Sequence, residues 1–148
     1  MYGLGGNLAV HQDAHGCLKK YEIQAKRAAN ANEVLGKDVV QCLSDGETVA
    51  TILGWLKDVS AGGGTAFSHP EARDVLFPER GSIAFWYNTL SSSDQDDQTS
   101  HSGCPVIAGS KMILDKWVRS FDNWKNVPCS IHGAKEYISL FPKPNSFV

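Results

Sequence analysis

Two residues near the start of the chain, His11 and Asp13, have the types and the spacing of metal ligands. The segment 7–13 has the composition of a β-strand, in which successive side chains alternate between the two faces. His11 and Asp13 are two positions apart and would therefore project from the same face. An imidazole and a carboxylate side by side are two of the three ligands of the 2-His-1-carboxylate triad that holds non-haem Fe(II). Because an isolated HxD sequence is common, the interpretation requires a second histidine elsewhere.

His101 is the candidate for that second histidine. It follows a polar loop, 91–100, and Lys111 comes ten residues after it. The stretch between them is long enough for a strand to leave the metal and for a turn at Gly109 to bring the lysine back beside it. We therefore predict a metal site of His11, Asp13 and His101, with Lys111 nearby.

The elements that must position these residues are predicted to be short strands. Thr48–Leu56 is a nearly continuous apolar run with β-branched residues, typical of a strand covered on both faces. Turn signals separate the segments every 8–15 residues, which favours a sandwich, jelly roll or barrel of about six to seven strands. The other predicted strands are 65–67, 82–88, and a final pair, 105–109 and 111–118, turned at Gly109 and Ser110, while 68–77 is predicted to be a loop.

The segment 17–45 differs from the rest. It is polar and rich in helix-forming residues, and it predicts a surface insertion that carries a short helix. Long loops beside active sites often act as lids, and a solvated insertion without a role is an equal alternative. We place the main domain at 1–129 and treat 130–148 as a peripheral C-terminal tail.

Composition excludes several classes of protein. The 148 residues, 42% hydrophobic and 20% charged with a net charge of −2, are those of one globular domain without a basic surface for nucleic acid. No apolar run approaches the ~18–20 residues that span a bilayer, and no signal peptide is visible. The four cysteines form no zinc-binding spacing, so disulfides and buried thiols both stay open.

The order of these motifs resembles one family, the catalytic domain of the collagen-type prolyl 4-hydroxylase α subunit. The resemblance covers residues 2–129 apart from the 17–45 insertion. It is carried by the HQD of 11–13, the TILGWLKDVSAGGGTAF of 51–67, the PERGSIAFWYN of 78–88, the TSHSGCPV of 99–106 and the segment 111–117.

The resemblance implies a mainly β double-stranded β-helix (jelly roll) that lacks the family's first strand and N-terminal helices, so the chain reads as a fragment. It implies that His11, Asp13 and His101 bind Fe(II), leaving positions for the co-substrate 2-oxoglutarate and for O2, with L-ascorbate keeping the iron reduced. It further implies that Lys111 pairs with the distal carboxylate of 2-oxoglutarate. Three residues would line the same pocket: Tyr2, Thr65 and Trp117.

The resemblance also carries expectations about cysteines, compartment and partners. Cys104 and Cys129 match a family pair that forms an intrachain disulfide, which implies the lumen of the endoplasmic reticulum. Cys17 and Cys42 flank the insertion and could close it as a second loop. The implied substrate is a proline-containing or procollagen-like peptide, hydroxylated to 4-hydroxyproline, and a partner subunit is possible as in the collagen-type enzymes.

The chain departs from the family where the peptide would bind. Leu8 stands in place of a tyrosine that contacts the substrate, Thr48 in place of an arginine, and Arg119 in place of a histidine. The metal and co-substrate residues are intact. Two alternatives to prolyl hydroxylation therefore stay open: a dioxygenase of the same type that acts on another protein side chain, and a truncated, non-catalytic jelly-roll interaction module.

Overall fold

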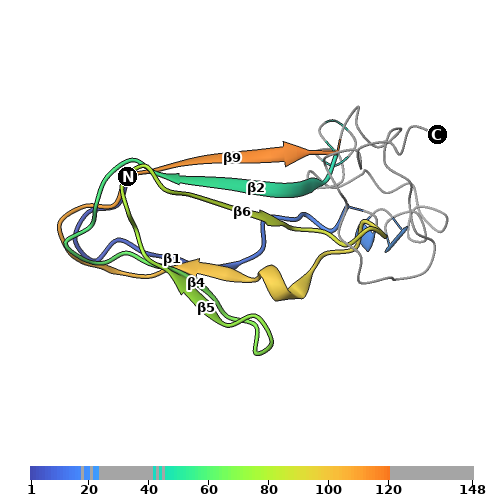
Figure 1. The fold of residues 1–148 in the computed structure, drawn as a ribbon. Coiled ribbons are helices and arrows are strands. Elements are labelled where there is room, and N and C mark those ends of the chain that lie inside the picture. Colours follow the sequence, from blue (N-terminus) through green and yellow to red (C-terminus); the bar gives the residue numbers. More distant parts are fainter. Residues whose placement is uncertain (18, 21, 24–41, 43, 45, 121–148) are drawn as a thin grey trace, which may run out of the picture.

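The structure is a computed structural model, and it describes residues 1–17, 19–20, 22–23, 42, 44 and 46–120. Two antiparallel sheets lie one above the other (Figure 1). The first has the strand order β1-β7-β4-β5 and the second β6-β2-β9, and a two-stranded ribbon, β3-β8, completes the set. The strands are β1 Leu8–His11, β2 Thr48–Trp55, β3 Ala61–Gly62, β4 Thr65–Phe67, β5 Asp74–Leu76, β6 Ile83–Tyr87, β7 His101–Gly103, β8 Val106–Ala108 and β9 Ile113–Arg119.

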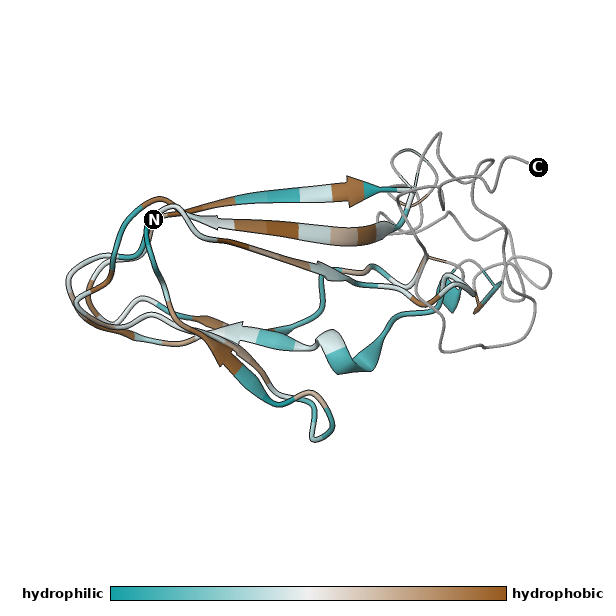
Figure 2. Cartoon of the chain, in the orientation of Figure 1, coloured by the Kyte–Doolittle hydropathy of each residue, from teal (hydrophilic) through white to brown (hydrophobic). Residues whose placement is uncertain are grey.

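Strand β2 is the centre of the second sheet. It pairs with β6 on one side and with β9 on the other, and most of its side chains are buried. Leu53 and Trp55 of β2 pack with Trp86 of β6 to form the core, and Phe67 and Leu76 reach it from the first sheet. The apolar residues along β2 are visible as brown segments in Figure 2. The prediction of a buried strand here is confirmed, and the mainly β, jelly-roll class is confirmed with it.

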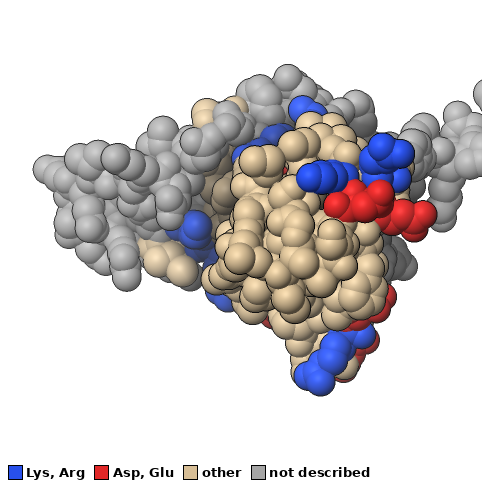
Figure 3. Space-filling view, turned by 90° about the vertical axis from the view of Figure 1, so that its left-hand side faces the viewer, with Lys and Arg blue, Asp and Glu red and all other residues tan. Residues whose placement is uncertain are grey.

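Charged residues are sparse at the end of the molecule that carries the N-terminus. The view onto that end shows a largely uncharged surface with lysine, arginine and acidic side chains at its margins (Figure 3). Within the described residues, no helix is long and apolar enough to cross a membrane.

The predicted pairing of the last two strands is wrong. β8 pairs with β3, whereas β9 pairs with β2 across the other sheet. The turn at Gly109, with φ of 85°, therefore joins two different sheets rather than the arms of a hairpin. Sequence separation suits a hairpin, but the long apolar face of β2 offers β9 far more backbone partners than the short β8 does.

The segment 68–77 also differs from its prediction, because β5 lies within it and pairs with β4. This strand has only three residues and its first two are exposed, so it has no apolar alternation for a sequence pattern to detect. The expected helix of the insertion begins at Cys17, and the described residues 17, 19, 20, 22 and 23 are helical. The predicted tail, 130–148, lies outside the described residues.

Candidate metal centre

The three predicted ligands come together at the end of one strand pair. β1 and β7 run antiparallel, and their register places His11 directly opposite His101. Asp13 follows two residues after β1, where the chain bends toward the second sheet. Its two carboxylate oxygens lie 3.6 Å from Nε2 of His11 and 3.7 Å from Nε2 of His101. The ligand atoms of all three residues lie within 4.8 Å of one another.

Both imidazoles are oriented by the backbone. Nδ1 of His11 lies 2.8 Å from the carbonyl oxygen of Ala9, and Nδ1 of His101 lies 2.9 Å from that of Thr99. When Nδ1 carries the proton and donates it to a carbonyl, the lone pair is on Nε2. Each Nε2 points to the carboxylate of Asp13, so both rings present their metal-binding nitrogens to one point.

A buried hydrogen-bond chain holds the carboxylate of Asp13. The hydroxyl of Thr51 donates to Oδ2 of Asp13 at 2.7 Å, and Nδ2 of Asn88 donates to the same hydroxyl at 2.8 Å. All three side chains are buried. Hydrogen bonds of this kind fix the orientation of a ligating carboxylate. Thr51 and Asn88 lie inside the predicted strands, where nothing in their types distinguishes them from structural residues.

Aromatic rings surround His101 and limit the access of water. The ring centroids of Trp86 and Phe67 lie 5.0 Å and 5.6 Å from that of His101. Burial is the largest influence on the imidazole and lowers the pKa of His101, while the carbonyl of Thr99 and the carboxylate of Asp13 oppose the shift. Since only a neutral imidazole can ligate a metal, this surrounding favours the ligand form.

Lys111 lies in the same pocket as the two histidines. The pocket is lined by residues of both sheets, among them His11, His101, Leu53, Thr65, Trp86 and Lys111. Lys111 is 3% exposed, and its Nζ lies 3.3 Å from Oγ1 of Thr65 and 3.4 Å from the carbonyl oxygen of Gly64. Burial lowers the pKa of Lys111, and the neighbouring Cys104 partly opposes this. Among the described residues, no carboxylate forms an ion pair with this lysine.

Tyr2 and Thr65, two of the predicted pocket residues, lie beside Lys111. The backbones of Tyr2 and Lys111 form a β-bridge with two hydrogen bonds, and Tyr2 lines the pocket. Trp117 lies farther along β9, paired with Thr51. Trp117 is 43% exposed, and the guanidinium of Arg119 lies 5.5 Å from its ring centre. The structure therefore places five predicted residues in the lining of one pocket, with Asp13 directly beside the two histidines, and Trp117 is not among the residues that line it.

The structure adds one acidic residue that the sequence did not identify. Asp115 lines the pocket from β9, two residues before Trp117. Partial burial raises the pKa of the Asp115 carboxyl, the nearby carboxylate of Asp13 adds to the rise, and His11 opposes it. The only sequence signal for Asp115 is its position. In the strand that follows Lys111, residues 113, 115 and 117 project from the same face.

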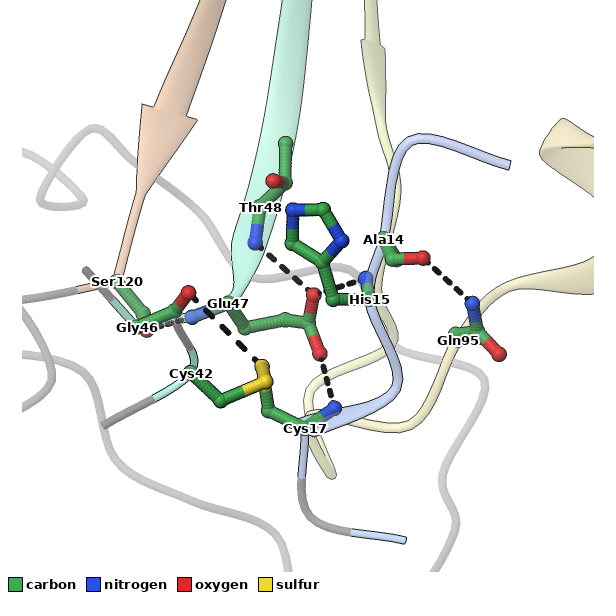
Figure 4. The surroundings of a disulfide bond; sticks show 9 residues. All are labelled: Ala14, His15, Cys17, Cys42, Gly46, Glu47, Thr48, Gln95 and Ser120. Atoms are coloured by element: carbon green, nitrogen blue, oxygen red, sulfur yellow. Dashed lines mark hydrogen bonds between the residues drawn. A yellow bond between two sulfur atoms is a disulfide. The ribbon is translucent and has the colours of Figure 1, made fainter. Parts of the chain in front are cut away.

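A buried glutamate holds the chain immediately after the metal ligands. The carboxylate of Glu47 accepts hydrogen bonds from the backbone N–H groups of His15, Cys17 and Thr48, the last two at 2.7 Å and 3.0 Å (Figure 4). Glu47 is 5% exposed and directly precedes β2. It therefore joins the segment that follows Asp13 to the central strand of the other sheet.

The same region contains the disulfide that the sequence left open. Cys17 and Cys42 are bonded, with their Cα atoms 5.5 Å apart, and the bond closes the 17–45 insertion at its base (Figure 4). Cys104 forms no disulfide with a described residue. Its predicted partner, Cys129, lies outside the described residues, so that pairing stays a prediction.

Comparison with known proteins gives one family. No family model matches the chain. The α-1 subunit of prolyl 4-hydroxylase from Rattus norvegicus is 34% identical over 130 residues, and that from Gallus gallus is 37% identical over 130 residues. Each alignment covers 88% of this chain. The chain spans about a fifth of the length of these curated relatives, 21% and 22% respectively.

Two solved structures have a similar fold. Both are of the viral collagen prolyl hydroxylase vCPH from Paramecium Bursaria Chlorella virus-1, one as a 2OG complex and one truncated. Each has a TM-score of 0.54 and covers 78% of this chain, at 23% and 24% identity and with 53% and 50% of the viral chain covered. The sequence relationship and the shared fold thus agree, and the chain is related along most of its length to a part of the prolyl 4-hydroxylase α subunits.

Proposed function

We propose that this chain is an Fe(II)- and 2-oxoglutarate-dependent dioxygenase that hydroxylates proline in peptides. The observation that carries the proposal is that one pocket is lined both by the histidines of a His-Asp-His cluster and by a buried lysine that forms no ion pair with any described acidic residue. The first is a site for a divalent cation, and the second is a site for an anion. The relatives named prolyl 4-hydroxylase support the reaction and the substrate.

The donor set fits Fe(II). Two neutral imidazoles and one carboxylate are the facial triad of non-haem iron oxygenases, and they leave three of six coordination positions open. His11, Asp13 and His101 would hold the metal. Thr51, by donating to Oδ2 of Asp13, orients the carboxylate.

The position of Lys111 fits the far carboxylate of 2-oxoglutarate. Lys111 contacts Thr65 of β4, and Phe67, two residues along that strand, pairs with His101. Two residues of a strand span about 7 Å, which suits a five-carbon dicarboxylic acid with one end at the lysine and the other at the metal. A fixed ammonium supplies the counter-charge for this end of the acid.

The residues of the pocket also control water and orientation. Leu53, Trp86 and Ile113 give it an apolar lining next to the ligands. Bound iron, with O2 and 2-oxoglutarate, supplies the oxidation of an unactivated C–H bond, and the keto acid leaves as succinate and CO2. The protein binds and orients the co-substrate, orients both histidines and excludes solvent.

The compartment and partners follow from the same proposal. We infer that the protein works in the lumen of the endoplasmic reticulum, because the Cys17–Cys42 disulfide needs an oxidising environment and the relatives are prolyl 4-hydroxylases. A procollagen-like peptide is the proposed substrate, L-ascorbate the proposed reductant that keeps the iron active, and a partner subunit is proposed by analogy with the collagen-type enzymes.

The test is turnover by the 148-residue chain. It should convert 2-oxoglutarate to succinate with Fe(II), O2, ascorbate and a proline-rich peptide, and mass spectrometry should find one added oxygen on proline. Chelation of the iron and the substitution His101→Ala should both abolish turnover. Succinate formation with the oxygen on another side chain would support the alternative substrate class. A correctly folded chain with neither iron binding nor succinate formation would leave only the non-catalytic interaction module.

A further inference from the structure

Asp115 presents a carboxylate to the pocket from the strand opposite the metal ligands. In β9, Asp115 pairs with Leu53 of β2, a buried residue of the pocket lining. Ile113, two residues earlier, lines the same pocket. Leu114, between them, is 62% exposed on the other face of the strand. Strand alternation therefore directs Asp115 toward the space in front of His11.

The carboxylate of Asp115 is too far from the triad to be a fourth ligand. The groups whose donor atoms lie within 4.8 Å of one another are His11, Asp13 and His101, and Asp115 is not among them. It does interact electrostatically with Asp13 and His11. Asp115 is thus next to the metal site and outside the ligand set, where a bound substrate would lie.

Asp115 lacks a cationic partner in the described part of the chain. No salt bridge joins it to a described lysine or arginine. Lys116 is on the opposite face of β9, and the guanidinium of Arg119 lies over the ring of Trp117. Asp115 is also exposed, so a ligand can reach it.

Charge balance in the loaded pocket leaves this carboxylate uncompensated. The two positive charges of Fe(II) and the one of Lys111 equal the two negative charges of 2-oxoglutarate and the one of Asp13. Asp115 adds one more negative charge beside an apolar wall. An unpaired carboxylate beside an apolar wall attracts a cation, and the exposure of Asp115 makes the gain a modest one.

We propose that Asp115 determines substrate specificity by pairing with a positively charged side chain, a lysine or an arginine, next to the residue that is hydroxylated. The inference rests on the proposed function, because it assumes that the substrate binds in front of the metal. It adds to that function a preference for peptides that carry a positive charge next to the hydroxylated residue.

The experiment compares two peptides that differ only in charge. One contains proline next to lysine and the other proline next to glutamine. Binding of each to the 148-residue chain, loaded with Fe(II) and 2-oxoglutarate and kept free of O2, is measured by calorimetry. The wild type should bind the lysine peptide about tenfold more tightly, the gain typical of one charge-assisted hydrogen bond. Asp115→Asn should bind both peptides equally.

The control variant is Asp58→Asn, which removes the same charge from an exposed residue outside the pocket lining. It should keep the tenfold preference. A wild type that turns over but binds the two peptides equally would overturn the inference, as would a preference that survives Asp115→Asn. A lysine preference that depends on Asp115 in a chain without turnover would support the cation site and contradict the proposed reaction instead.

Discussion

At the scale of single residues, the site depends on polar side chains that hydrogen bonds hold in one orientation. Backbone carbonyls orient the imidazoles of His11 and His101, and the hydroxyl of Thr51 orients the carboxylate of Asp13. Lys111 is the exception, since its ammonium is buried against a carbonyl and a hydroxyl and forms no ion pair with a carboxylate of the described residues. The three candidate ligands are therefore oriented before a metal binds, whereas the ammonium of Lys111 would gain a counter-charge from a bound anion.

The hydroxyl of Thr51 should strengthen metal binding. Thr51→Val removes the donor to Asp13 with little change in shape, and loss of a hydrogen bond to a ligating carboxylate typically costs about 10- to 100-fold in metal affinity. The affinity can be measured by titration with Fe(II) under anaerobic conditions. Thr48→Val is the matched control, because Thr48 is buried in the same strand and its hydroxyl has no hydrogen-bond partner. Equal affinities of the two variants would contradict the role of Thr51.

The buried charge of Lys111 should make stability depend on pH. Because burial lowers its pKa, the charged form is less favourable in the folded chain than in the unfolded chain. The destabilisation is complete at pH values below the folded pKa and disappears as pH rises toward the unfolded value, about 10.4. Without ligands, Lys111→Met should therefore unfold at higher urea concentration than the wild type at pH 7, and the difference should shrink by pH 10.

The same variant separates this effect from simple packing. Lys111→Met should also weaken the binding of 2-oxoglutarate, since the ammonium is lost. Lys116→Met, on the exposed face of β9, should change neither property. A difference in urea midpoint that is constant between pH 7 and pH 10 would show that the charge of Lys111 is not the cause.

At the scale of elements, the strand pairs set the distances between the ligands. The antiparallel register of β1 and β7 places the two histidines opposite each other, and β2 supplies the threonine that reaches Asp13. Glu47, at the start of β2, binds the turn that follows the ligands. The Cys17–Cys42 bond closes the adjacent insertion. The site is therefore built where three elements meet and not by any one of them.

Glu47 should contribute strongly to the stability of this junction. Glu47→Ala leaves three backbone N–H groups without their acceptor, and unsatisfied buried donors cost about 1–3 kcal/mol each. Partial access of water reduces the sum, so we expect a loss of about 2–4 kcal/mol in the free energy of unfolding. Denaturant titration measures it. Glu79→Ala, at an exposed glutamate, should lose less than about 0.5 kcal/mol.

At the scale of the whole molecule, the pocket lies between the two sheets. Its lining includes His11, Thr65 and His101 from the first sheet and Leu53, Trp86 and Asp115 from the second. Ligands that contact both sheets bind the folded chain and not the unfolded one. Binding of the metal and the co-substrate should therefore stabilise the folded chain.

Binding should raise the thermal stability of the chain in two steps. Fe(II) alone should raise the melting temperature, and 2-oxoglutarate should raise it further only when the metal is present. A ligand at 100 times its Kd adds about 2.7 kcal/mol to the free energy of unfolding. Differential scanning calorimetry without O2 measures both steps. Lys111→Met should keep the first step and lose most of the second, and a second step of unchanged size would contradict the proposed anion site.

The sequence by itself determined which residues are candidates for the chemistry proposed for this protein. Residue types decide what can ligate a metal, and the ordered motifs around His11, Asp13, His101 and Lys111 were enough to predict a β fold, a ligand set and a family. The buried strand at 48–56 was also predictable, because an apolar run with β-branched residues has few other stable arrangements.

Only the tertiary structure decided which strands pair and which side chains share the pocket. β9 pairs with β2 and not with β8, and this register directs Asp115 toward the candidate metal site and places Thr51 against Asp13. Glu47 and Asn88 are ordinary polar residues until distant backbone groups reach them. The physical reason is that hydrogen bonding and burial depend on contacts between segments far apart in the chain, which local sequence patterns do not encode.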